Sequence, residues 1–170
     1  EGGTGEAKTA GNYGASLIAG QEARDRQCAQ VLWLDAKERR YVEEIGAMNV
    51  MFVIDDTLIT PPLTGTILPG VTRSCVLELA RDHDSPVEQR RLTIDELTAA
   101  IDDGRCQESF GCGTAAVITA IRSFQYRGRE YPVRDEPGPV SQNMLKMITD
   151  IQWGRVVDPY GWTHLVRRAA

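Results

Sequence analysis

The sequence predicts a mixed α/β domain, an α+β mixture in which short strands and hairpins are separated by amphipathic helices. Apolar runs of strand length are bounded by turn residues, and apolar stripes with helical spacing lie between them. The length of 170 residues suits one hydrophobic core, which would bury about two-thirds of the surface of the unfolded chain. We therefore expect a single domain over residues 1–170.

The first helix is predicted to begin at Asn12, which is a good helix N-cap. Its apolar stripe consists of Tyr13, Leu17, Ile18, Ala19 and Ala23. This places Lys8 in the loop before the helix and Tyr13 in its first turn.

Strands are predicted next, because short apolar runs follow one another with turn residues between them. Residues 30–34 form a buried strand, and a charged turn at 35–39 leads to a second strand at 41–44. Residues 49–54 and 57–60 are predicted to form a hairpin that turns at Asp55 and Asp56.

A helix is predicted to start near Val71 and Thr72, after Ile67-Leu68-Pro69-Gly70. The unpaired amides at such a helix start and the helix dipole both favour an anion. This position is therefore a natural seat for a phosphate group.

Four more elements complete the predicted domain. A capping box at 93–96 opens a helix to about Asp103, and a small-residue turn at 112–116 leads into a strand. Residues 124–133 are predicted to form a hairpin. Pro139 opens a last helix that ends at Gly154, with Val140, Met144, Leu145, Ile148 and Ile151 facing inward.

Composition excludes several classes of function. A net charge of -5 disfavours a nucleic-acid partner, and no apolar run approaches the length of a membrane span. The four cysteines and two histidines lack metal-site spacing, so we expect no metal site and reduced thiols in a cytoplasmic protein. The chain begins at Glu1 rather than Met, so we expect it to be part of a longer one.

The segment from Gly2 to Tyr13 sets Lys8 among small residues, where the chain can bend closely around a ligand. Two chemistries use such a lysine: a phosphate cradle, or an amine that forms a Schiff base with a carbonyl. The P-loop pattern fits imperfectly, because Ala7 stands where that loop has glycine. The pattern also has a strand just before the loop, and the chain begins at Glu1. A nucleotide-binding module and a solvated surface lysine remain alternatives.

Five segments together resemble the branched-chain amino acid aminotransferases, which are class IV (fold-type IV) pyridoxal-phosphate enzymes. These segments are residues 2–13, 42–49, 67–73, 111–116 and 159–162. The resemblance implies a domain like that of D-amino-acid aminotransferase, a mixed β pseudo-barrel surrounded by helices. It also implies that residues 1–170 are the C-terminal large domain, and that the N-terminal small domain is absent from this chain.

The resemblance implies roles for three residues around pyridoxal 5'-phosphate, in a cleft whose walls come from distant loops. Lys8 matches the lysine that holds the cofactor covalently and moves the proton at the substrate Cα. Tyr13 matches the residue that bonds the phenolate oxygen of the cofactor. Glu44 matches the carboxylate that keeps the pyridine nitrogen protonated.

Other positions match cofactor and substrate contacts of the family. Leu68 matches a residue packed on the ring, Val71 and Thr72 match the phosphate ligands, and Thr114 also belongs to the implied cofactor site. The implied substrate-binding residues, which would hold the α-carboxylate, are Ala47, Gly113, Thr114 and Ala115. Ala116 and Thr119 stand where some relatives carry a redox pair of cysteines, so thiol control of that kind is not expected.

The implied reaction is transamination between L-leucine, L-isoleucine or L-valine and 2-oxoglutarate, in a homodimer. D-amino-acid transaminase and aminodeoxychorismate lyase remain alternatives within the same fold. A truncated, non-catalytic domain is a further alternative.

Overall fold

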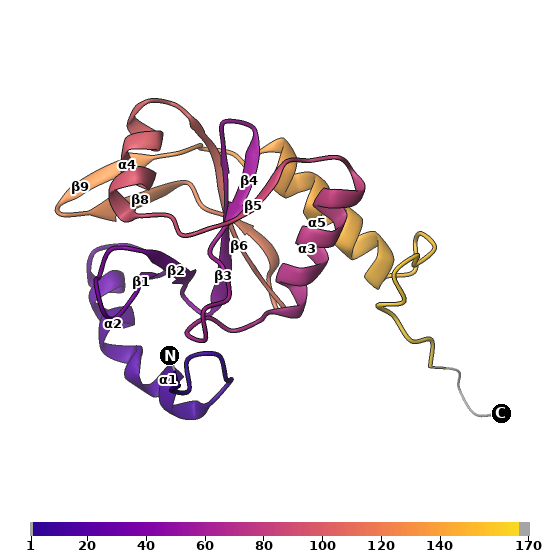
Figure 1. The fold of residues 1–170 in the computed structure, drawn as a ribbon, viewed down its shortest axis with the longest axis horizontal. Coiled ribbons are helices and arrows are strands. Elements are labelled where there is room, and N and C mark those ends of the chain that lie inside the picture. The colour runs from indigo at the N-terminus through magenta and orange to yellow at the C-terminus, as the bar shows by residue number, and fades with distance from the viewer. Residues whose placement is uncertain (1, 167–170) are drawn as a thin grey trace.

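The computed structural model describes residues 2–166, which form a seven-stranded sheet and a separate two-stranded hairpin (Figure 1). The mixed α/β character predicted from the sequence is confirmed. The sheet contains β1 (Leu32–Leu34), β2 (Val42–Ile45), β3 (Met48–Ile54), β4 (Thr57–Thr60), β5 (Val87–Gln89), β6 (Cys106–Gly113) and β7 (Val117–Ala120). The hairpin consists of β8 (Ser123–Tyr126) and β9 (Arg129–Pro132).

Strand β3 is the centre of the sheet. It pairs with β6 along one edge, while β2 and β4 share the other edge, each pairing with a different part of β3. A strand with neighbours on both edges satisfies its backbone hydrogen bonds internally, so it can be buried. Residues 49–54 are all buried, which agrees with their nearly continuous apolar sequence.

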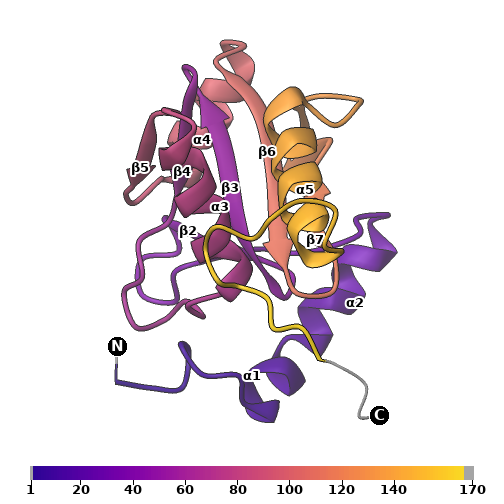
Figure 2. The same cartoon turned by 90° about the vertical axis from the view of Figure 1, so that its right-hand side faces the viewer.

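Helices cover both faces of the sheet. Helices α3 (Val71–Asp82) and α5 (Pro139–Gln152) lie on one face, and α4 (Ile94–Asp102) and the β8–β9 hairpin lie on the other (Figures 1 and 2). The apolar residues separate accordingly into two clusters. One contains Phe52, Leu92, Leu97 and Phe124, and the other contains Met51, Val76, Phe110 and Met144.

The N-terminal helices lie outside both clusters. Helices α1 (Ala10–Ala15) and α2 (Leu17–Asp25) contain no buried residue, and Leu17 and Ile18 are 67% and 76% exposed. The predicted single helix is therefore two short helices, whose apolar residues do not pack into the core. The predicted N-cap was wrong, because the cap is Thr9 and Asn12 lies inside α1.

The structure differs from the sequence predictions at further places. Strand β5 and most of β6 were missed, and Cys112 and Gly113 end β6 rather than forming a turn, which lies at residues 114–116. Leu145, predicted to face inward, is 37% exposed. The pairings of the described residues define a mixed sheet, and the closed pseudo-barrel remains a prediction.

Among residues 2–166, no helix has the length and apolar character needed to cross a bilayer.

Candidate active site

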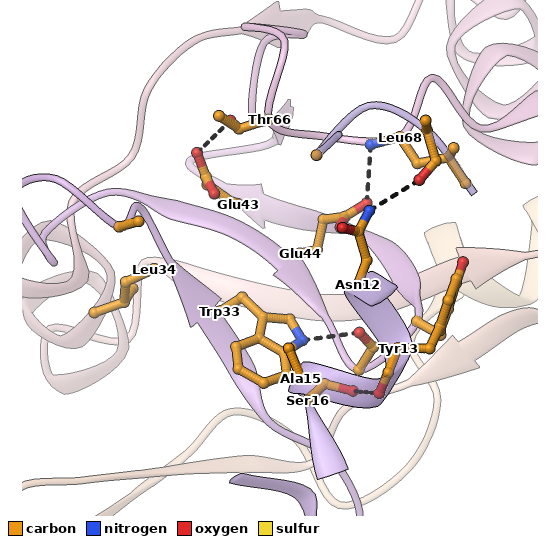
Figure 3. A pocket seen from close by; sticks show the side chains of 15 residues that line it. Asn12, Tyr13, Ala15, Ser16, Trp33, Leu34, Glu43, Glu44, Thr66 and Leu68 are labelled. Carbon is orange, nitrogen blue, oxygen red and sulfur yellow. Dashed lines mark hydrogen bonds between the residues drawn. The ribbon is translucent and has the colours of Figure 1, made fainter. Parts of the chain in front are cut away.

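The predicted site residues gather at one end of the sheet. Glu44 on β2 lies opposite Asn49 on β3, which in turn lies opposite Cys112 on β6. The turns that follow β2 and β6 therefore project from the same end, because antiparallel hairpins alternate direction. A cavity of about 300 Å³ lies between β2 and the N-terminal loop with α1 (Figure 3).

The cavity is lined by the N-terminal loop and α1, by β1 and β2, and by the segment before α3. Its lining comprises Gly5, Ala7, Asn12, Tyr13, Ala15, Ser16, Trp33, Leu34, Ala36, Glu43, Glu44, Gly46, Ala47, Thr66 and Leu68. Four predicted site residues therefore share this cavity: Tyr13, Glu44, Ala47 and Leu68.

Lys8 lies next to this cavity but does not line it. Its Nζ donates a hydrogen bond to Tyr13 Oη at 3.0 Å. The side chain is exposed, which differs from the enclosed cleft expected from the sequence. The reason is that the loop and the helices that carry Lys8 and Tyr13 bury none of their residues in the core.

Asn12 gives this exposed loop a defined shape. Its Nδ2 donates to the carbonyl oxygens of Thr4 at 2.7 Å and Ala7 at 2.9 Å, and its Oδ1 accepts from the Thr4 hydroxyl. Gly5 packs so closely on Thr66 that an added Cβ would stand 2.8 Å from the Thr66 Cα. The loop is therefore held both by Asn12 and by a contact that only glycine permits.

Glu44 lines the cavity, and its surroundings change its pKa strongly. Its Oε1 accepts hydrogen bonds from the Leu68 N–H and from Asn49 Nδ2, each at 3.3 Å (the bond from Leu68 is seen in Figure 3). Burial raises the pKa of Glu44 to about 7, against the opposing effect of the Leu68 N–H; the Glu43 carboxylate raises this pKa and the Lys8 ammonium lowers it. Lys8 and Glu44 are therefore close enough to interact electrostatically.

The start of α3 offers unpaired donors. Gly70 caps the helix in an extended conformation with no side-chain cap bond, and the first helical bond is from Ser74 N–H to the Gly70 carbonyl oxygen. The N–H groups of Val71 and Thr72 have no hydrogen-bond partner among residues 2–166. These amides can hold an anion.

The remaining predicted residues do not line the cavity. Val71 is largely exposed, and Thr114 and Ala115 are exposed in the turn after β6. Gly113 packs against β3, where an added Cβ would meet the Met48 Cγ at 3.3 Å. The structure places them at the same end of the sheet, and their individual roles stay predictions.

Sequence reasoning missed four residues of this site: Asn12, Glu43, Asn49 and Thr66. Glu43 Oε1 accepts a hydrogen bond from the Thr66 hydroxyl at 2.6 Å, so both adjacent glutamates reach the cavity (Figure 3). Asn49 left a detectable signal, because an asparagine within an apolar strand must find partners when it is buried. Cys112, by contrast, is an apolar filler, since burial raises its thiol pKa to about 12.

Together these groups fit a flat cofactor with four distinct polar positions. The amine of Lys8 suits a carbonyl, the hydroxyl of Tyr13 suits a phenolate oxygen, and the carboxylate of Glu44 suits a ring nitrogen. The free amides of Val71 and Thr72 suit a phosphate. This set of donors and acceptors matches pyridoxal phosphate.

Comparison with known proteins identifies the family of this chain. The sequence model of the family described as "Amino-transferase class IV" matches residues 4–124. The probable branched-chain-amino-acid aminotransferase of Staphylococcus epidermidis is 48% identical over 162 residues, covering 95% of this chain and 45% of that protein. Branched-chain-amino-acid transaminase 1 of Bacillus subtilis is 48% identical over 163 residues, covering 95% and 46%.

Solved structures agree with these relatives. The branched-chain amino acid aminotransferase from Escherichia coli superposes with a TM-score of 0.77 at 32% identity, over 93% of this chain and 50% of that one. The T.th. branched-chain amino acid aminotransferase complexed with N-(5'-phosphopyridoxyl)-L-glutamate gives a TM-score of 0.79 at 30% identity, over 95% and 51%. The chain thus spans about half the length of the relatives it matches. It belongs to the class IV aminotransferase family, as a homologue of the branched-chain amino acid aminotransferases.

Proposed function

We propose that residues 1–170 form the C-terminal large domain of a branched-chain amino acid transaminase that uses pyridoxal 5'-phosphate. The reaction exchanges the amino group of L-leucine, L-isoleucine or L-valine with 2-oxoglutarate, giving branched-chain 2-oxo acids and L-glutamate. The observation that carries this proposal is the pairing of Lys8 with Tyr13 beside Glu44, in a chain 48% identical to such enzymes.

The proposed roles follow from the chemistry of each group. Pyridoxal phosphate, when bound, supplies a ring that accepts the electron pair released at the substrate Cα. Lys8 supplies the amine that attaches the cofactor and then moves the proton at that carbon. Tyr13, which accepts a hydrogen bond from Lys8, binds the phenolate oxygen of the cofactor. Glu44 provides negative charge for the ring nitrogen.

Most of the residues proposed to bind the phosphate and the substrate do not line the cavity. We assign the phosphate to the amides of Val71 and Thr72 and to the Thr114 hydroxyl. Leu68 packs on the ring, while Ala47, Gly113, Thr114 and Ala115 hold the substrate carboxylate. The small side chains of these last residues leave room for backbone N–H groups to approach a carboxylate.

The proposal includes a cytoplasmic homodimer and an N-terminal small domain outside this chain, with the large domain built as a pseudo-barrel. The similarity to branched-chain enzymes favours this reaction over D-amino-acid transamination and over aminodeoxychorismate lyase activity. Membership of the class IV family also favours cofactor attachment over nucleotide binding at Lys8.

Borohydride reduction tests the proposal directly, because it converts a reversible lysine linkage to pyridoxal phosphate into a permanent one. The purified chain is incubated with pyridoxal phosphate, reduced and mapped by peptide mass spectrometry. We expect the label on Lys8, and Lys8→Ala should abolish it. Transfer of the amino group should be measurable with L-leucine and not with D-alanine.

Lys37 provides a matched control, because it is also an exposed lysine. Lys37→Ala should leave labelling at Lys8 unchanged. Label spread evenly over the lysines, or magnesium-dependent ATP binding by unlabelled protein, would overturn the proposal.

A further inference from the structure

We propose that Asn49 is a positioning residue, which fixes the carboxylate of Glu44 against the turn that leads into α3. This inference rests on the proposed function, in which Glu44 faces the ring nitrogen and the start of α3 holds the phosphate. Asn49 would therefore fix the distance between the group that faces the ring nitrogen and the group that holds the phosphate, without touching the reacting atoms.

The contacts of Asn49 support this role. Asn49 lies directly across from Glu44 in the β2–β3 pair and is 5% exposed. Its Nδ2 donates to the Leu68 carbonyl oxygen at 2.9 Å and to Glu44 Oε1 at 3.3 Å. Because a carbonyl oxygen can only accept, the nitrogen of the amide must face Leu68.

The Leu68 backbone closes the network. Its N–H donates to the same Glu44 Oε1 that Asn49 contacts, at 3.3 Å, while its carbonyl oxygen accepts from Asn49. Asn49, Glu44 and Leu68 thus form three mutual hydrogen bonds. Two donors on one carboxylate oxygen restrict how Glu44 can rotate, and they stabilise its charged form.

The other side of Asn49 is equally constrained. A Cβ added at Gly70 would collide with Asn49 Oδ1, so the amide is packed against the residue that caps α3. Residues 68–70 therefore approach β3 as closely as glycine allows. Displacing Asn49 should disturb both the orientation of Glu44 and the position of the Val71 and Thr72 amides.

The experiment follows the titration of Glu44 in the cofactor-free chain by carbon-13 NMR of labelled glutamate, with Glu44→Gln used to assign the signal. Asn49→Ala should raise the Glu44 midpoint by about one pH unit, the size expected when hydrogen bonds to a carboxylate are lost. The same variant should weaken pyridoxal phosphate binding by about tenfold, because Glu44 and the amides at the start of α3 would no longer be aligned with each other.

Thr60→Val is the matched control, because Thr60 is likewise a buried polar residue of the sheet; its hydroxyl donates one hydrogen bond, to the Val50 carbonyl oxygen at 2.8 Å. This variant should lose stability without moving the Glu44 midpoint. If Asn49→Ala does not fold, Asn49→Ser, which is too short to reach Glu44, should give the same upward change.

Two results would overturn the inference: an unchanged Glu44 midpoint in both Asn49 variants, or an equal change in Thr60→Val. Failure of the proposed function gives a different pattern. In that case the unmodified chain would take no label on Lys8, while the Glu44 titration would still respond to Asn49.

Discussion

Glu44 binds its proton more tightly in the folded chain than in the unfolded one, since its pKa is raised from 4.5 to about 7. Between these values the folded state holds more protons, so the free energy of unfolding must fall as the pH rises. The contribution of the protonated acid is fully present below pH 4.5 and is lost as the pH passes about 7. The cofactor-free site is therefore under electrostatic strain at neutral pH.

Glu44→Gln should remove this dependence, because the amide stays neutral. We expect urea unfolding of the cofactor-free variant to show a smaller loss of stability between about pH 5 and about pH 8 than the unmodified chain shows. Glu130→Gln, at an exposed position on β9, should retain the original slope. Identical slopes for all three proteins would refute the assignment. The same Glu44→Gln variant should still attach cofactor at Lys8 but lose most of its turnover.

Gly5 is a second residue whose substitution should affect the site without affecting the stability of the fold. An alanine methyl at Gly5 would stand 2.8 Å from the Thr66 Cα and 2.9 Å from its carbonyl oxygen, so the loop that carries Lys8 must move. Gly5→Ala should slow labelling of Lys8 by roughly tenfold or more, since small misplacements of a reacting group are costly. The thermal midpoint should hardly change, because this loop buries little.

Gly3→Ala is the control for that prediction, because an added Cβ at Gly3 meets no atom within 4 Å. Its labelling rate should stay within about twofold of the original, as expected for an exposed substitution without new contacts. Equal slowing by both substitutions would show that loop flexibility, rather than the contact with Thr66, limits the reaction.

Helix α5 is capped by a side chain from a strand of the sheet. Glu108 on β6 is 4% exposed, and its two carboxylate oxygens accept from the N–H groups of Val140 at 2.8 Å and Ser141 at 2.9 Å. A carboxylate at a helix start also interacts favourably with the helix dipole. Gly138 is required beside it, because an added Cβ would collide with the Glu108 side chain.

Glu108→Gln should lower the free energy of unfolding by about 1–3 kcal/mol, because it replaces a charge-assisted acceptor with an amide whose NH₂ faces backbone N–H groups. Urea denaturation gives this value, with Glu130→Gln as an exposed control expected to change stability by less than about 0.5 kcal/mol. A loss no larger than that of the control would show that α5 does not depend on this cap.

This cap also explains why β6 was hard to predict. Gln107, Glu108 and Ser109 resemble a polar loop in the sequence, yet Glu108 and Ser109 are buried because their partners come from α5 and from Ile121. Sequence patterns predicted structure correctly where the interacting residues are close in sequence. The predicted start of α4 is confirmed by the bond from Glu96 N–H to Thr93 Oγ1 at 3.0 Å, although the Glu96 side chain bonds Arg90 and does not complete the capping box. Pro139 begins α5 as predicted.

In the candidate site, too, contacts between residues close in sequence were easier to predict than contacts between distant residues. The approach of Lys8 to Tyr13 could be expected from their spacing in a loop and the adjoining helical turn. The contact of Glu44 with Leu68 joins residues 24 positions apart, so periodicity could not reveal it, and only the family resemblance placed them together. Asn49 was missed because its shorter hydrogen bond goes to the Leu68 carbonyl oxygen, 19 positions away, which no local pattern reveals.

The whole molecule consists of a well-packed body and an N-terminal segment that carries Lys8. In Figure 2, α1 lies below the sheet, away from the face that α3 and α5 cover. Val50, Met51 and Phe52 on β3 are fully buried, whereas α1 and α2 bury no residue. Local opening is least costly where few apolar contacts are lost, so α1 and α2 should open independently of the body.

Hydrogen exchange of the cofactor-free chain tests this division. Amides of β3 and β6 should exchange only through global unfolding, while those of α2 should exchange at opening free energies lower by at least about 2 kcal/mol. Pyridoxal phosphate should slow exchange in α1, because attachment at Lys8 and contacts with Glu44 would connect the segment to the sheet. Pyridoxine 5'-phosphate, which has no aldehyde to react with Lys8, should protect α1 much less. If α2 without cofactor were as protected as β3, the two parts would form one cooperative unit, and the exposure of Lys8 would not reflect a separable segment.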